Sequence, residues 1–298
     1  MGCVYAVEHP VHTSVVVKLL HEDFRGDPAM VARMTEEART AQQVSHRNVV
    51  RVLDRGETAA GVPFVAMERV RGVPLEALVQ RDGPLSLARI LSIAEQILGG
   101  LAAIHRASLV HGDMKSDNVL IEVGPAGDLV TIIDFGLARP TAKPEAHTTG
   151  QPVSGTPDYM APEVIRGERP TTATDLYAVG VILYELLTGT TPFGGGEAST
   201  IFERHLRDEV PPPSLRCPDR PIPPAFERVI LRALEKEPMM RYRDAEEFAC
   251  DLARSVPPDF HDVAIRSDQP AFSTTAPTRA WSRPSAPAPC CPDHAARR

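Results

Sequence analysis

The chain has 298 residues, 43% of them apolar and 24% charged, which is typical of a globular protein. Its net charge of −7, from 32 basic and 39 acidic residues, argues against a nucleic-acid-binding protein with a concentrated basic face. It contains no run of about 18 apolar residues and no basic-then-apolar leader, so we expect no membrane span and no signal peptide. The five scattered cysteines form no C-x-x-C pair, which favours a reducing compartment, and we expect a cytoplasmic location.

The first 70 residues predict a small antiparallel sheet with one helix. Helical spacing of apolar residues predicts a helix at 28–45, with Pro28 in its first turn. Short runs rich in β-branched residues alternate with turn signals and predict strands. These strands are expected at 4–7, 13–20, 49–55 and 63–70. The turn between the last two is expected to carry Gly56 and Gly61.

From Gly72 onward the pattern becomes mainly helical, with one hairpin. The apolar runs 119–121 and 130–133 predict the two strands of that hairpin. Helices are predicted at 86–106, 174–188, 197–208, 224–235 and 244–254.

The composition changes again near residue 254. Pro, Ala, Ser and Thr dominate residues 255–298 and the apolar periodicity is lost, so we expect a mostly disordered tail there. The predicted organisation is a small sheet-containing lobe at 1–70, a larger helical lobe at 71–254 and the tail at 255–298.

One stretch of the helical part carries a dense set of chemically useful side chains. Residues 111–118 read His-Gly-Asp-Met-Lys-Ser-Asp-Asn, and residues 134–136 read Asp-Phe-Gly. An Asp, a Lys and an Asn at this spacing, followed by a second Asp, supply the groups that phosphoryl transfer requires. The two segments resemble the H-R-D-x-K-x-x-N and D-F-G motifs of the protein kinases, apart from Gly112. The resemblance spans roughly residues 2–253 and implies an α+β, bilobal fold, with a small antiparallel sheet and one helix in one lobe and mainly α-helices in the other.

The resemblance also implies a role for each of these side chains. Asp113 is expected to be the catalytic base that accepts the proton of a substrate hydroxyl, and Lys115 to neutralise charge on the transferred phosphoryl group. Asn118 and Asp134 are the implied ligands of the Mg²⁺ ions that bridge the phosphates of ATP. Asp175 resembles the helix residue that braces the backbone of the catalytic loop.

Lys18, within Val-Val-Val-Lys, resembles the strand lysine that binds the α- and β-phosphates of ATP. Its implied partner is Glu37, which lies nine residues before His46 in a stretch similar to the family's E-x(8)-H-x-N-[IV]-V segment. Glu36 is the alternative partner, although neighbouring residues on a helix point about 100° apart.

Residues 67–70 read Met-Glu-Arg-Val and resemble the linker between the two kinase lobes. By resemblance, Met67 is expected at the back of the adenine pocket, and backbone groups of Glu68 and Val70 are expected to bind the adenine edge. Leu120 is expected to pack beneath the adenine ring. The same linker residues are equally typical of the end of an ordinary strand, so this assignment depends on position within the family pattern.

Residues 155–163 read Gly-Thr-Pro-Asp-Tyr-Met-Ala-Pro-Glu and resemble the kinase segment that receives the protein substrate. Lys115 with Thr156 is similar to the pair that approaches the catalytic aspartate in serine/threonine kinases. Glu163 is expected to form a buried ion pair with Arg241. This segment, with Leu-Leu-Thr-Gly-Thr-Thr-Pro-Phe after it, most resembles bacterial serine/threonine kinases.

The chain departs from the family pattern at its start, where a strand and a G-x-G-x-x-G-x-V loop are expected. Residues 1–5 resemble only the tail of that loop, with Gly2 as its last glycine and Val4 as the residue over the adenine. Loss of about two backbone hydrogen bonds to phosphate, at ~1.5–3 kcal/mol each, would weaken ATP binding. We expect in-frame codons upstream of Met1 to encode the missing strand and glycines.

A second departure is Gly112, where the family usually has an Arg that binds a phosphate on the activation loop. Without that Arg, phosphorylation at Thr148 or Thr149 is expected to couple weakly to activity. Because the change removes no catalytic group, the chemistry is expected to survive it.

Together the motifs predict a non-specific serine/threonine protein kinase of bacterial type that uses ATP and Mg²⁺ to phosphorylate protein hydroxyls. The alternative is a pseudokinase that acts as a binding module or scaffold; the shortened loop favours it, and the intact catalytic and metal-binding residues oppose it. A small-molecule phosphotransferase on a related fold is disfavoured by the substrate segment at 155–163. The sequence indicates neither the identity of the protein substrate nor an oligomeric state.

Overall fold

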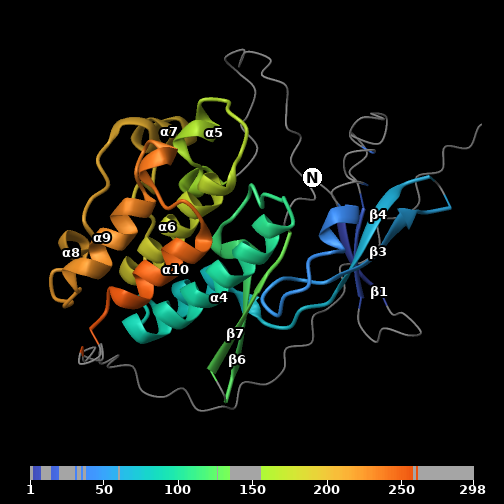
Figure 1. The fold of residues 1–298 in the computed structure, drawn as a ribbon, viewed down its shortest axis with the longest axis horizontal. Coiled ribbons are helices and arrows are strands. Elements are labelled where there is room, and N and C mark those ends of the chain that lie inside the picture. Colours follow the sequence, from blue (N-terminus) through green and yellow to red (C-terminus); the bar gives the residue numbers. More distant parts are fainter. Residues whose placement is uncertain are drawn as a thin grey trace, which may run out of the picture. The chain divides into compact units, whose positions relative to one another are not determined.

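The computed structural model describes residues 3–7, 15–19, 31, 35, 38–59, 61–125, 127–134, 156–257 and 260, all within a unit of residues 1–264 (Figure 1). Several positions named above lie outside the described residues: Gly2, Glu36, Glu37, Phe135, Gly136, Thr148, Thr149, Gly155 and the tail from residue 261 onward.

The N-terminal part forms the expected four-stranded antiparallel sheet. Its strands are β1 (Cys3–Val7), β2 (Val15–Leu19), β3 (Val52–Glu57) and β4 (Pro63–Glu68), in the order β1-β2-β4-β3. The run of three valines that opens β2 suits a strand, because β-branched side chains pack well on a pleated surface. The predicted sheet is therefore confirmed in its number and direction of strands.

Strand β3 begins at Val52, three residues later than predicted, and Gly56 lies inside it instead of in the turn. The reason is a competing partner for the preceding segment. Val50 N–H donates to Ile132 O (2.9 Å) and Ile132 N–H donates to Asn48 O (2.8 Å), so this segment pairs with the helical lobe. The buried Asn48 side chain holds it there by donating to Val130 O at 2.7 Å.

The helix predicted at 28–45 ends earlier than expected. Within the described residues it is helical at 31, 35 and 38–41, and a turn follows at 42–43. Backbone hydrogen bonds from Gln43 to Thr40 (3.0 Å) and from Val44 to Ala41 (3.1 Å) tighten the last turn. Sequence periodicity extended through this turn because Val44 is buried although it is not helical.

The larger part of the chain is mainly helical, as predicted. The long helices α4, α6, α7, α9 and α10 begin and end within two residues of their expected positions. The sequence pattern gives no bounds for the short helices α3, α5 and α8. The helices are α3 (Leu75–Asp82), α4 (Leu87–Arg106), α5 (Pro162–Ile165), α6 (Thr172–Thr188), α7 (Ala198–Arg207), α8 (Pro213–Arg216), α9 (Pro224–Ala233) and α10 (Ala245–Arg254). Short 3₁₀ turns are η1 (Ser116–Asn118), η2 (Pro157–Tyr159) and η3 (Pro238–Met240).

A second sheet adjoins the catalytic loop, the segment of residues 107–118 that contains Asp113, Lys115 and Asn118. It consists of β5 (Val73–Pro74), β6 (Val119–Gly124) and β7 (Gly127–Ile132), and β6 and β7 form the predicted hairpin. The loop of residues 107–115 lies between α4 and η1, and η1 leads directly into β6. The hairpin therefore places the end of the catalytic loop beside Ile133 and Asp134, which follow β7.

Helix α4 packs against β7, α6 and α10 in the core of this lobe (Figure 1). Its start is capped by Ser86, whose hydroxyl accepts from Arg89 N–H at 3.3 Å. Among the described helices it alone is long and apolar enough to cross a membrane, with a mean hydropathy of 1.5, but 56% of that stretch is buried inside the fold. That burial fits a core helix of the lobe.

Candidate active site

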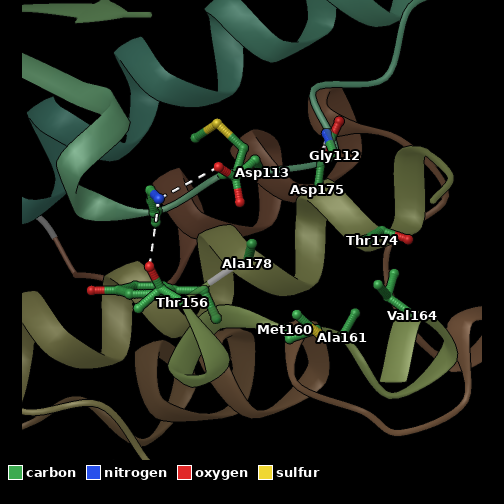
Figure 2. Close-up of a pocket in the computed structure, with 12 residues that line it drawn as sticks. Gly112, Asp113, Thr156, Met160, Ala161, Val164, Thr174, Asp175 and Ala178 are labelled. Carbon is green, nitrogen blue, oxygen red and sulfur yellow. Dashed lines mark hydrogen bonds and ion pairs between the residues drawn. The ribbon is translucent and has the colours of Figure 1, made fainter. Parts of the chain in front are cut away.

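The three predicted catalytic-loop residues lie in direct contact. Lys115 Nζ is 3.4 Å from Asp113 Oδ2 and also 3.4 Å from Thr156 Oγ1, the two contacts drawn as dashed lines in Figure 2. Asn118 Nδ2 donates to the backbone carbonyl of Asp113 at 2.7 Å and lies 3.4 Å from its Oδ2. The Asp113 carboxylate is thus positioned between a cation and an amide.

Asp175, on α6, braces the backbone of this loop as predicted. Its carboxylate accepts from the N–H groups of His111 (2.9 Å) and Gly112 (2.8 Å) and lies 2.8 Å from His105 Nε2. The residue is only 1% exposed. Because hydrogen bonds to a charged acceptor are the stronger kind, this contact ties the loop firmly to the core helix.

His111 is a residue whose role the sequence did not reveal. Its Nδ1 accepts from Asp113 N–H (3.3 Å), so Nε2 carries the proton and donates to Ile133 O (3.0 Å). Burial lowers the pKa of His111, which keeps the ring neutral and able to make both bonds. The ring therefore connects the catalytic loop to the residue before Asp134. Its apolar neighbours Leu109 and Val110 were the available signal of burial.

Lys18 reaches from the sheet to Asp134, at 3.0 Å between Nζ and Oδ1. The lysine is 5% exposed, so the contact satisfies a charge that would be costly to bury alone. Asp134 has a φ of +61°, a conformation that non-glycine residues adopt rarely and that clusters at active sites. Two predicted site residues from different parts of the chain thus meet.

Two predicted adenine-pocket residues share a sheet face with Lys18. Val4 on β1 pairs directly with Lys18 on β2, and residues that pair in this way project from the same face. Met67 on β4 pairs with Val16, which is two residues from Lys18 and so lies on that face too. Val4, on the edge strand, is 56% exposed, and Met67 is buried.

The remaining residues predicted to contact adenine lie in the linker and on β6. Glu68 N–H donates to Arg51 O at 3.0 Å. Val70 is half-buried against the core after β4. Leu120 is half-buried on β6, where it pairs with Thr131 and Pro74.

Residues of the segment predicted to receive a protein substrate line a pocket beside Asp113 (Figure 2). The described residues of this segment begin at Thr156, enter η2 and continue into α5. The pocket is lined by Gly112, Asp113, Met114, Lys115, Thr156, Tyr159, Met160, Ala161, Val164, Thr174, Asp175 and Ala178. It is therefore shaped by the catalytic loop, the substrate segment and α6 together.

The predicted ion pair between Glu163 and Arg241 is confirmed. Two parallel hydrogen bonds of 2.8 Å join the guanidinium to the carboxylate, and both residues are 2% exposed. Thr174 Oγ1 also donates to Glu163 (2.9 Å), and Arg241 donates to the backbone carbonyls of residues 173, 235 and 236. The pair holds the end of the substrate segment against the lobe.

Comparison with known proteins agrees with this arrangement. Residues 1–250 match the family described as the protein kinase domain. The chain belongs to the protein kinase family. It is 42% identical over 242 residues to the serine/threonine-protein kinase pkn3 of Myxococcus xanthus, an alignment that covers 80% of this chain. It is 35% identical over 265 residues, 87% of this chain, to the serine/threonine-protein kinase PknB of Mycobacterium leprae.

Solved kinase structures share the fold. The PknI kinase domain of Mycobacterium tuberculosis superposes with a TM-score of 0.65 and 25% identity, covering 86% of this chain and 90% of that one. Rad53 in complex with AMP-PNP superposes with a TM-score of 0.69 and 26% identity, covering 84% of this chain and 62% of that one. The two curated relatives are longer, and the kinase chain spans 44% and 42% of their lengths.

Proposed function

We propose that this kinase chain transfers the γ-phosphoryl group of ATP to serine or threonine hydroxyls of proteins. The observation that carries the proposal is the meeting of Lys18 from the sheet with Asp134, beside the linked Asp113, Lys115 and Asn118. Phosphoryl transfer requires positioned charge more than covalent chemistry, and this arrangement supplies it. The related serine/threonine-protein kinases support the same reaction class.

Each side chain has a task that its contacts suit. Asp113 accepts the proton of the attacking hydroxyl, and Asn118 holds the aspartate backbone in place for this step. Lys115 lies between Asp113 and Thr156, where it can neutralise charge on the transferred group. Lys18 anchors the phosphates of the nucleotide. Rad53, which shares the fold, has been solved in complex with AMP-PNP.

The donor set fits magnesium. Asp134 presents a carboxylate, and since the Asn118 amide nitrogen is turned to Asp113, its oxygen is the atom that can bind a cation. Among the described residues no group of three or more His, Cys, Asp or Glu could hold a metal alone. The two oxygen donors, from Asp134 and Asn118, suit Mg²⁺, which commonly uses one or two protein oxygens together with substrate phosphates. Bound there, Mg²⁺ would neutralise the charge that develops on the phosphates.

The substrate segment supports a protein acceptor. Thr156 contacts Lys115 and lines the pocket beside Asp113, where an acceptor hydroxyl would have to lie. We propose a cytoplasmic signalling role; the free thiols of Cys217 and Cys250 are compatible with a reducing compartment.

The test is a phosphoryl-transfer assay with Mg-ATP and a serine/threonine peptide library. We expect transfer by the parent chain and a loss of about 10²–10⁴-fold in kcat for Asp113→Asn, because the amide cannot accept the proton. Asp251→Asn is the matched control, since Asp251 pairs with Arg232 on α9 and touches none of the site residues.

Equal activity in Asp113→Asn and the parent would contradict the proposed base. Absence of transfer from a folded parent chain would contradict the proposed function. Transfer to tyrosine peptides alone would contradict the serine/threonine assignment.

A further inference from the structure

The catalytic loop contains a buried hydroxyl that the proposed chemistry does not use. Ser116 follows Lys115 directly, opens η1 and is completely buried. Its Oγ lies 2.6 Å from the hydroxyl oxygen of Tyr159, the last residue of η2. A bond this short between two buried hydroxyls joins the catalytic loop to the substrate segment.

The direction of the hydrogen bonds follows from the next contact. Tyr159 OH donates to Glu185 Oε2 on α6 at 2.7 Å, which uses its single proton. With that proton used, the Ser116 hydroxyl supplies the proton of the 2.6 Å contact, and it also interacts with the Glu185 carboxylate. Burial raises the pKa of Tyr159, so the phenol stays protonated. The result is a chain from Ser116 through Tyr159 to Glu185, with each residue at most 8% exposed.

These hydrogen bonds form a second link between the catalytic loop and the substrate segment. Thr156, the residue immediately before η2, contacts Lys115, and Tyr159, the last residue of η2, contacts Ser116. Two consecutive residues, Lys115 and Ser116, thus contact the residues at the two ends of this turn. Thr156 and Tyr159 line the pocket beside Asp113. The second link therefore helps to fix the position of this side of the pocket.

We propose that Ser116 is a positioning residue that holds the substrate segment in register with Asp113 and thereby sets affinity for the protein substrate. The inference rests on the proposed kinase function. Ser116 acts on the substrate segment through Tyr159, whereas the backbone around Asp113 is held by the bonds from Gly112 to Asp175 and from Asn118 to Asp113. Removing the hydroxyl should therefore affect peptide binding more than the chemical step or the binding of ATP.

The experiment compares Ser116→Ala with the parent chain in steady-state kinetics. One neutral hydrogen bond corresponds to roughly a threefold to tenfold rise in the KM for peptide. The KM for ATP and kcat should change less than about twofold, because Lys18, Asp134 and Asp113 keep their contacts. Ser255→Ala is the matched control: Ser255 is also buried, but its hydroxyl bonds to Leu252 O within the end of α10.

A second measurement is independent of activity. Hydrogen exchange at the amides of Tyr159 and Met160, which bond within η2, should be faster in Ser116→Ala and unchanged in Ser255→Ala. Tyr159→Phe should raise the peptide KM as well, and the double variant should add little to it, because both changes break the same link.

Unchanged peptide KM in Ser116→Ala, or an equal rise in the KM for ATP, would overturn the inference. So would unchanged exchange in η2, even if the parent chain were an active kinase. An inactive parent would instead overturn the proposed function and the kinetic role of Ser116 with it, while the exchange data would still decide whether the hydroxyl holds the segment.

Discussion

Gly112 shows how one departure from the family pattern has a local physical meaning. Its φ is +70°, in the left-handed region that glycine reaches without the clash of a Cβ atom. Its N–H must keep this orientation to donate to Asp175 at 2.8 Å. Glycine therefore suits the brace between the catalytic loop and α6, although it removes the phosphate-binding Arg expected by resemblance.

Gly112→Ala should destabilise the chain by about 1–2 kcal/mol, because alanine is strained at this φ. The measurement is the free energy of unfolding in urea. Gly99→Ala is the control: Gly99 lies in α4, and a Cβ there would make only an ordinary 3.6 Å contact with His46. Alanine is the better helix former, so that variant should not lose stability. Equal losses in both variants would contradict the strain argument.

At the level of the secondary-structure elements, the ion pair between Glu163 and Arg241 joins α5 to the segment that follows η3. Because both residues are buried, removing one partner leaves an uncompensated charge. Arg241→Met should therefore lower the free energy of unfolding by about 3–5 kcal/mol. The double variant Glu163→Met with Arg241→Met should recover part of this loss, since no bare charge remains. A double variant less stable than the single one would contradict this account.

The same pair predicts how stability depends on pH. Burial would raise the pKa of Glu163, but the hydrogen bonds and charge of Arg241 outweigh burial and hold the pKa below its ordinary value of 4.5. The pair therefore contributes fully above about pH 4.5 and loses its contribution as the pH falls below that value. Unfolding measured between pH 7 and 3 should show a shallower decline in the double variant than in the parent.

At the scale of the whole domain, a bound nucleotide should contact both the N-terminal sheet and the helical part. Lys18 comes from β2 and Asp134 follows β7, so a ligand that engages both stabilises the folded state as a whole. A ligand at about 100 times its Kd contributes roughly 2.7 kcal/mol. Mg²⁺ with AMP-PNP should therefore raise the Tm of the parent, and Lys18→Met should largely abolish the shift.

Lys236→Met is the control for that measurement. Lys236 is also partly buried, with its Nζ 4.3 Å from the centre of the Phe193 ring, in the helical part. It should keep the shift caused by the nucleotide, whatever its starting Tm. An equal shift in Lys18→Met and the parent would show that Lys18 does not bind the phosphates.

Much of this arrangement could be predicted because its signals are local in the chain. Asp113, Lys115 and Asn118 lie within one short loop, so their spacing already places them together. The long helices have strong apolar periodicity and were predicted nearly to the residue, whereas short α5 and α8 carry too few turns to give such a pattern.

Other features depend on contacts between residues far apart in the chain. Lys18 and Asp134 are 116 positions apart, and their direct pairing depends on how the sheet packs against β7. Residues 48–50 have strand character, but their partner is β7 instead of β4, which shortened β3. The kinase family and its chemical groups could be predicted from the resemblance of short motifs, because the residues of each motif are close together in the sequence. The partners of Ser116, His111 and Lys18 were determined only by the tertiary structure. Folding buries these side chains next to residues far away in the sequence, and the spacing of residues along the chain does not indicate such contacts.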